Sequence, residues 1–164
     1  MPPEPLFDLS KLNLTHVLVD KAGIEAVNPQ RFELQQLDAI VYVDPAQHLV
    51  VGYKDATPHE FWVRGHMPDY PLMPGVIMCE AAAQLMGWYS KSHGLLEGAM
   101  IVFSGMDGVR FRGQVRVGDR FVIMTKGTKI HRRQVTCAAQ GFVAGKMVFQ
   151  ADIIGMPYSP REEA

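Results

Sequence analysis

The chain has 164 residues, 48% of them apolar and 20% charged, which predicts one globular domain over residues 1–164. Its net charge of −1 at pH 7 argues against bulk nucleic-acid binding, and two cysteines without close spacing give no disulfide scaffold. The opening Met-Pro-Pro-Glu-Pro lacks the basic and apolar regions of a signal peptide, so we expect a cytosolic protein.

The N-terminal third predicts a short helix and a β-hairpin. Residues 1–15 are polar and rich in proline, and we expect a loose lead-in there. Residues 22–27 indicate a short helix, followed by an Asn-Pro turn. The strand-like runs 37–43 and 48–54 are separated by Asp-Pro-Ala-Gln, a turn signal, so they should pair as a hairpin.

A central helix is predicted over residues 76–90. Pro74 suits a helix start, and Gly75 leaves a bare N–H at the positive end of the helix dipole. Apolar side chains lie all round, so the helix should be buried, and it should end near Ser92-His93-Gly94. Its length also suits a membrane span, but the Pro-Gly start and the polar residues within it favour a core helix, so no membrane partner is expected.

Strand-like runs follow this helix, with short connections and glycine-containing turns between them. They cover residues 99–105, 109–116, 120–131, 134–144 and 146–154. One buried helix followed by successive strands predicts an α+β domain with a largely antiparallel sheet. Residues 156–164 read as a polar tail.

The order His66, then a helix opened by Pro-Gly, then Glu80 brings together a base, an anion site and an acid. Glu80 is the one charged residue between Asp69 and Lys91, and burial should raise its pKa so that it holds a proton near pH 7. A hydrogen bond from Gln84, one turn on, would support it. Two simpler interpretations remain: Glu80 as a structural carboxyl and His66 as a hydrogen-bonded loop histidine.

Two ordered motifs resemble a known family, the β-hydroxyacyl-acyl-carrier-protein dehydratases of the FabZ type. The first comprises His66-Met67-Pro68, Pro71-Leu72-Met73-Pro74-Gly75-Val76, Glu80-Ala81 and Gln84. The second comprises Asp107-Gly108-Val109-Arg110-Phe111-Arg112, Val115 and Val117-Gly118-Asp119. The likeness runs from about residue 31 to residue 154, and it implies a hot-dog fold, in which a curved antiparallel sheet wraps one long helix.

The resemblance also implies a function. The chain would be a hydro-lyase that removes water from a 3-hydroxyacyl thioester on acyl carrier protein and yields trans-2-enoyl-ACP for fatty-acid synthesis. His66 would be the base, the Gly75 N–H would hold the thioester oxygen, and Glu80 would be the acid. His66 and Glu80 of one site would come from different subunits, so at least a homodimer is implied. The substrate-binding residues expected from the motifs are Leu72, Gln84, Arg110 and Arg112.

Basic residues concentrate between residues 110 and 133. This stretch contains eight Lys or Arg residues and one acidic residue, Asp119. Such a belt should attract an acidic partner, and the resemblance implies acyl carrier protein. The alternative is that these are solvent-facing strand positions. Nucleic acid is disfavoured because no aromatic-studded face accompanies the charges.

No cofactor or metal is expected. His59-Glu60 opens like a zinc motif, but the next histidine, His66, is seven residues after His59 rather than one helical turn. An acyl tunnel needs apolar walls, and the candidates for it are Met78, Leu85, Met86, Trp88, Phe103 and Phe111.

The chain departs from the family pattern near the base and near the N-terminus. Asp69-Tyr70 stands where the family usually shows Gly and a basic or polar residue, which bears on acyl preference. Pro29-Gln30-Arg31 stands near a usual Pro-His-Arg, and Glu33, Gln35 and Gln36 replace apolar residues after it, so this segment should pack differently. Two rival functions remain: a hot-dog thioesterase, and a non-catalytic module that binds an acyl chain or a carrier protein. The related dehydratase-isomerases carry Asp at the position of Glu80, so the resemblance favours dehydration without isomerisation.

Overall fold

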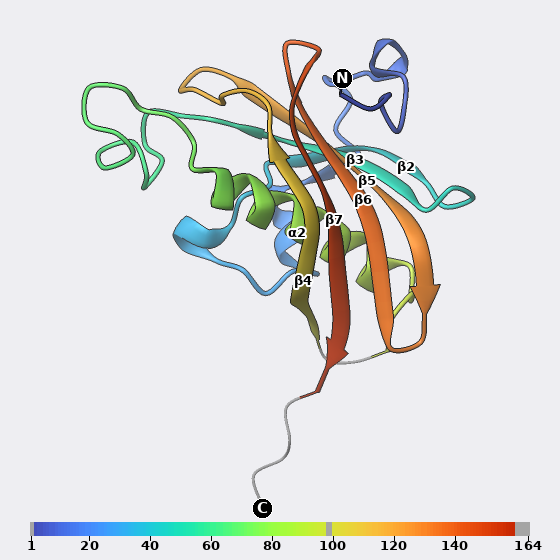
Figure 1. The fold of residues 1–164 in the computed structure, drawn as a ribbon. Coiled ribbons are helices and arrows are strands. Elements are labelled where there is room, and N and C mark those ends of the chain that lie inside the picture. Colours follow the sequence, from blue (N-terminus) through green and yellow to red (C-terminus); the bar gives the residue numbers. More distant parts are fainter. Residues whose placement is uncertain (1, 98–99, 160–164) are drawn as a thin grey trace, which may run out of the picture.

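The computed structural model describes residues 2–97 and 100–159. In these residues seven strands form one antiparallel sheet in the order β1-β2-β3-β5-β6-β7-β4, which curves around the long helix α2 (Figure 1). The strands are β1 Val19–Asp20, β2 Ala39–Asp44, β3 Leu49–Asp55, β4 Met100–Phe111, β5 Arg120–His131, β6 Gln134–Val143 and β7 Lys146–Tyr158. The helices are α1 Lys21–Glu25 and α2 Gly75–Ser92, with single 3₁₀ turns at Leu9–Lys11 and Phe32–Leu34. The α+β hot-dog prediction is confirmed.

Helix α2 begins and ends where its sequence predicts. Pro74 precedes its first residue, Gly75. At the other end, Gly94 adopts a φ of 62°, which glycine reaches without strain. The Gly94 N–H donates to the Lys91 carbonyl and the Leu95 N–H to the Ser90 carbonyl, the paired bonds of a Schellman motif. None of the helices in the described residues has the length and apolarity needed to span a membrane.

The predicted hairpin is confirmed, with β2 and β3 antiparallel. Strand β3 is buried on both faces, which explains why its sequence is almost continuously apolar. Val50 belongs to the core around α2, whereas Val51 and Tyr53 belong to a second cluster on the outer face of the sheet.

Residues 100–111 form one strand where the sequence predicted two. Strand β4 runs through the predicted break, with register shifts between Phe103 and Gly105 and between Asp107 and Arg110. The glycines that resemble turn signals therefore lie in or beside bulges, which bend a strand without ending it. The second predicted strand was wrong beyond Phe111, because residues 112–119 form a connection to β5. Residue 99 lies outside the described residues.

The two ends of the chain are more structured than expected. Strand β7 continues to Tyr158, so the polar tail predicted from residue 156 starts too early, and residues 160–164 lie outside the described part. The lead-in was predicted to be loose, but its apolar side chains pack on the outer face of the sheet. The Leu6 N–H donates to Gln140 Oε1 at 2.8 Å, and Arg120 donates to the Leu14 carbonyl at 3.1 Å.

Candidate active site

His66 lies in the loop between β3 and α2. One hydrogen bond shows which of its two ring nitrogens carries the lone pair in the neutral imidazole. Its Nδ1 lies 2.9 Å from the carbonyl oxygen of Leu72, which can only accept a hydrogen bond. In the neutral ring, Nδ1 therefore carries the proton, and the lone pair is on Nε2. The loop is closed by the Leu72 N–H, which donates to the His66 carbonyl at 2.9 Å. An imidazole held in this way can take a proton through Nε2.

Leu72 is itself positioned by the connection between β4 and β5. It forms an isolated β-bridge with Arg116, and the Met73 N–H donates to the Val115 carbonyl at 2.8 Å. In Figure 1 these two loops lie at the end of the molecule where α2 begins. Leu72 was predicted to bind substrate; the structure gives its carbonyl the task of orienting the base.

Gly75 opens α2 with an unpartnered N–H. Pro74 makes no side-chain capping bond, and no acceptor among the described residues takes the Gly75 N–H. The ring of Phe111 lies over this glycine, so closely that an added Cβ would be 2.6 Å from Phe111 Cζ. Glycine is therefore the residue that leaves room for the ring on the Cβ side of this position. An open N–H at the positive end of a helix dipole can hold a developing oxyanion.

Glu80 is partly exposed in the single chain, although the sequence predicted a buried carboxyl. The reason is its place on α2: Val76, Glu80, Ala83, Gly87 and Lys91 form one stripe, and none of the five is buried by the sheet. Val76, at the start of the stripe, is 72% exposed. The sequence predicted burial on every side of α2 because apolar residues lie all round it. That pattern does not show which side of the helix is covered by the sheet of the same chain.

Gln84 holds Glu80 in place through a chain of buried and partly buried hydrogen bonds. Its Nε2 donates to Glu80 Oε1 at 2.7 Å and to the Leu34 carbonyl at 2.5 Å. Its Oε1 accepts from the Gln36 N–H at 2.9 Å, and its carbonyl accepts from Asn28 at 3.0 Å. The predicted bond to Glu80 is present. Gln84 was predicted to bind substrate. In the structure its side-chain amide is hydrogen-bonded within the chain, so its role is to position Glu80.

No hydrogen bond joins His66 to Glu80 within the single chain that the structure describes. The base and the open Gly75 N–H lie near the start of α2, and Glu80 follows Gly75 by more than one helical turn on the uncovered stripe. All three groups are thus available for acid–base chemistry, and the side of α2 that carries Glu80 is open to a second molecule.

Comparison with known proteins places this constellation in a family. The model of the FabA-like domain matches residues 28–152. The chain belongs to the FabA/FabZ-type dehydratase family. Relatives named 3-hydroxyacyl-[acyl-carrier-protein] dehydratase FabZ include that of Desulfotalea psychrophila, 32% identical over 139 residues, which cover 83% of this chain and 91% of the relative. That of Streptococcus pneumoniae is 32% identical over 130 residues, 79% of this chain and 91% of the relative.

Solved structures show the same fold at low sequence identity. The dehydratase heterocomplex ApeI:P from Xenorhabdus doucetiae aligns with a TM-score of 0.71 at 14% identity, covering 85% of this chain and 91% of that chain. The E. coli PaaI protein aligns with a TM-score of 0.57 at 14% identity, covering 73% and 78%. These likenesses confirm the fold of the dehydratase.

The basic residues of the dehydratase form two groups rather than one belt. Arg110, Arg112 and Arg116 are exposed near Gly75 and His66, where Arg116 lies 4.4 Å above the Tyr70 ring. The remainder lie along β5, which is about 40 Å long, and on the β5–β6 turn. Of these, Arg120 is paired with Asp55 at 2.6 Å. Only the first group is placed to meet a partner at the candidate site.

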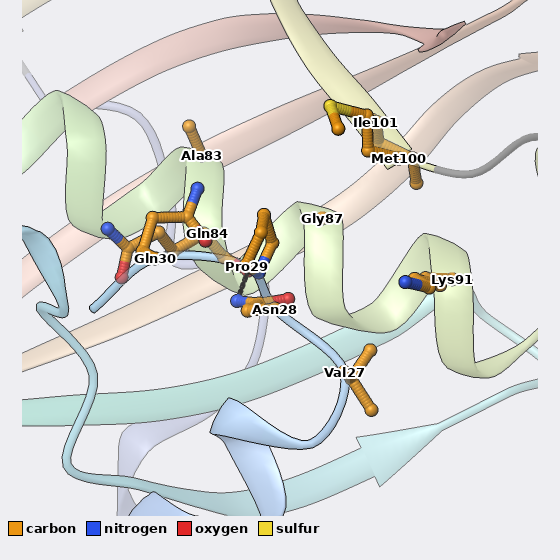
Figure 2. Close-up of a pocket in the computed structure, with 10 residues that line it drawn as sticks. All are labelled: Val27, Asn28, Pro29, Gln30, Ala83, Gln84, Gly87, Lys91, Met100 and Ile101. Carbon is orange, nitrogen blue, oxygen red and sulfur yellow. Dashed lines mark hydrogen bonds between the residues drawn. The ribbon is translucent and has the colours of Figure 1, made fainter. Parts of the chain in front are cut away.

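A groove runs along α2 beside the Glu80–Gln84 pair. Its walls are Ala83, Gln84, Gly87 and Lys91 of α2, the segment 27–30 and the first residues of β4, Met100 and Ile101 (Figure 2). None of the six residues predicted to form an acyl tunnel lines it. Met78, Leu85, Met86 and Trp88 are buried in the core, and Phe103 and Phe111 are exposed on β4. The groove was missed because its floor consists of Ala83 and Gly87, small residues at helical spacing that leave space rather than fill it.

Two other groups near the site do not offer the chemistry of a nucleophile or a metal ligand set. Burial raises the pKa of the Cys79 thiol, which keeps it protonated and unreactive beside Glu80. His59 is exposed, and Glu60 forms an ion pair with Lys54 at 2.9 Å, so His59-Glu60 is not the start of a metal site. In the described residues no three His, Cys, Asp or Glu side chains gather as metal ligands.

Proposed function

We propose that this protein dehydrates 3-hydroxyacyl thioesters carried by acyl carrier protein, giving trans-2-enoyl-ACP. The observation that carries the proposal is the bond from His66 Nδ1 to the Leu72 carbonyl, which leaves Nε2 free to act as a base in the loop that leads to the unpartnered Gly75 N–H. FabZ relatives cover most of the chain and bear the name of this reaction.

The reaction follows from these groups. His66 Nε2 takes a proton from the carbon next to the thioester carbonyl, and the Gly75 N–H holds the negative charge that grows on the thioester oxygen. As the bond from carbon 3 to its hydroxyl breaks, Glu80 gives its proton to the leaving oxygen, and water departs. The proton on His66 then returns to Glu80 through solvent. Every step uses groups of the chain itself, so we propose that neither a metal nor a cofactor is needed.

We propose that the working unit is at least a dimer, in which His66 of one subunit meets Glu80 of the other. Strand β4 is an edge of the sheet in the described residues. Exposed apolar residues lie on and beside this edge, among them Phe103 at 51%, Met156 at 40% and Tyr158 at 48%. An unpaired apolar edge is a surface for strand pairing. A second copy placed there would also cover the open stripe of α2.

We propose that the acyl chain lies in the groove along α2 and that the carrier protein docks on Arg110, Arg112 and Arg116. The groove begins at Gln84, which holds Glu80, and its walls are mostly apolar. Two free cysteines suit the reducing cytosol, where we place the enzyme.

The test of the function is direct. Incubating the protein with 3-hydroxybutanoyl-ACP should raise the absorbance of the conjugated enoyl thioester, at a rate that a chelator such as EDTA does not lower. Release of free acid would instead identify a thioesterase, and binding without turnover would identify a binding module.

Charge reversal at the docking site should weaken use of the carrier. Among the described residues, Arg110 donates a side-chain hydrogen bond only to its own strand, at the Val109 carbonyl, so Arg110→Glu should leave the fold intact. We expect the KM for 3-hydroxyacyl-ACP to rise about tenfold because like charges now face each other, with no change for a short pantetheine thioester. Arg133→Glu, on the β5–β6 turn, is the matched control. Equal effects of both reversals would contradict docking at Arg110.

A further inference from the structure

Gln84 is bound by both ends of the segment 28–36, which lies between α1 and β2. Asn28, which is 6% exposed, donates from Nδ2 to the Gln84 backbone carbonyl at 3.0 Å (Figure 2). At the other end of the segment, the Leu34 carbonyl and the Gln36 N–H bond to the Gln84 side-chain amide. Hydrogen bonds from one segment therefore converge on one residue of α2.

The two bonds to the side chain allow one orientation of the Gln84 amide. A carbonyl oxygen can only accept, so the Leu34 carbonyl requires the Nε2 group. An N–H can only donate, so the Gln36 N–H requires Oε1. A flipped amide would set two acceptors against each other at one contact and two donors at the other. The second hydrogen of Nε2 is thereby directed at Glu80 Oε1, 2.7 Å away.

This fixed donor decides which oxygen of Glu80 carries the proton. In a neutral carboxyl group one oxygen accepts hydrogen bonds and the other bears the hydrogen. Because Gln84 Nε2 donates to Oε1, Oε1 is the accepting oxygen and the hydrogen is on Oε2. Among the described residues Oε2 has no hydrogen-bond partner, so its O–H can donate to a leaving hydroxyl.

The turn that carries Asn28 is itself held to α1. The Asn28 N–H donates to the Ile24 carbonyl at 2.9 Å. Arg31 Nη1 donates to the carbonyls of Asn28 and Gln30 at 2.7 and 2.8 Å, and Arg31 Nη2 donates to the Glu25 carbonyl at 2.8 Å. The Asn28 side chain is therefore presented to α2 from a turn whose main chain is fixed.

We propose that the segment 28–36 positions the catalytic acid, with Asn28 as a positioning residue that acts through Gln84 to keep the Glu80 proton on Oε2. This inference rests on the proposed function, because it takes Glu80 as the proton donor to the leaving hydroxyl. Loss of the Asn28 bond releases one end of the segment and lets the Gln84 amide turn. The O–H of Glu80 is then aimed at the leaving group in fewer substrate complexes, which lowers kcat with little effect on KM.

Asn28→Asp is the sharpest variant, because it keeps the size of the side chain and cannot donate to the Gln84 carbonyl. We expect kcat for 3-hydroxybutanoyl-ACP to fall at least about tenfold, with KM within about twofold of the parent value. Asn28→Ala, which removes the donor without adding charge, should lower kcat in the same way. Asn13→Asp is the matched control, since Asn13 is exposed and an aspartate oxygen can still accept its bonds from Thr15.

A double-mutant cycle tests the route through Glu80. In a Glu80→Gln background there is no carboxyl proton to direct, so Asn28→Asp should lower kcat no further. An equal fall in both backgrounds would mean a general weakening of the fold and would overturn the positioning role. Parental kcat in Asn28→Asp would overturn it as well.

A measurement on the parent protein separates this inference from the proposed function. The side-chain NH₂ hydrogens of Gln84, assigned by NMR through comparison with Gln84→Met, should exchange slowly with solvent and at least about tenfold faster in Asn28→Asp. Rapid exchange in the parent protein would overturn the positioning role even if no Asn28 variant folds. Slow exchange without any dehydration would overturn the proposed function alone.

Discussion

Replacing His66 by alanine should lower kcat/KM for dehydration at least ~100-fold, the size of loss expected when a general base is removed. The physical reason is the assigned tautomer: the Leu72 carbonyl holds the proton on Nδ1 and leaves Nε2 as the group that accepts the substrate proton. Enoyl absorbance with a 3-hydroxyacyl-ACP measures the effect, and the KM should change little, because His66 acts on a proton rather than on the acyl chain.

His59→Ala is the matched control, since His59 is an exposed histidine in the same loop region. It should keep full activity. Near-parental turnover in His66→Ala would remove this imidazole from the mechanism and return His66 to a structural role in the loop.

Replacing Glu80 by glutamine should also slow dehydration about 100-fold or more, because the leaving hydroxyl loses its proton donor. The fold should survive, since a glutamine oxygen can still accept the bond that Gln84 Nε2 makes to Glu80 Oε1 at 2.7 Å. Melting temperature and turnover, measured side by side, separate the two roles. A large drop in melting temperature would support the structural-carboxyl interpretation, and Glu97→Gln, at an exposed site, is the control.

Mixing these two variants tests the shared site. If His66 and Glu80 of one site belong to different subunits, a hybrid dimer of His66→Ala and Glu80→Gln contains one complete site. Random exchange of subunits makes half of the dimers hybrid, so about a quarter of the parental activity should return. No recovery after complete exchange, shown by mass spectrometry of tagged subunits, would mean that both groups act within one chain.

The sequence predicted the helix and the two acid–base residues because each has a local signal. Pro74-Gly75 and Gly94 mark the ends of α2 through backbone geometry that depends on a few neighbouring residues. The His66 and Glu80 assignments came with the family motif. The bond that orients His66 could not be predicted, because it depends on a β-bridge between Leu72 and Arg116, which lie far apart in sequence.

The errors have physical causes as well. Gly105 and Gly108 resemble turns, yet β4 continues through them because its pairing with β7 resumes after each register shift. The basic belt divides because residues close in sequence on an extended strand are far apart in space. The groove is left open by the small residues Ala83 and Gly87, and a pattern of apolar residues in the sequence does not show where space is left unfilled.

The N-terminal segment on the outer face of the sheet has a practical consequence for studying this enzyme. Leu6, Leu9 and their neighbours shield an apolar surface that includes Val51, Tyr53 and Met124. A truncated or clipped protein would bare that surface and self-associate through it, on the side of the sheet opposite to α2. Sedimentation or light scattering of such material would then report an assembly unrelated to catalysis, so stoichiometry should be measured on the intact chain.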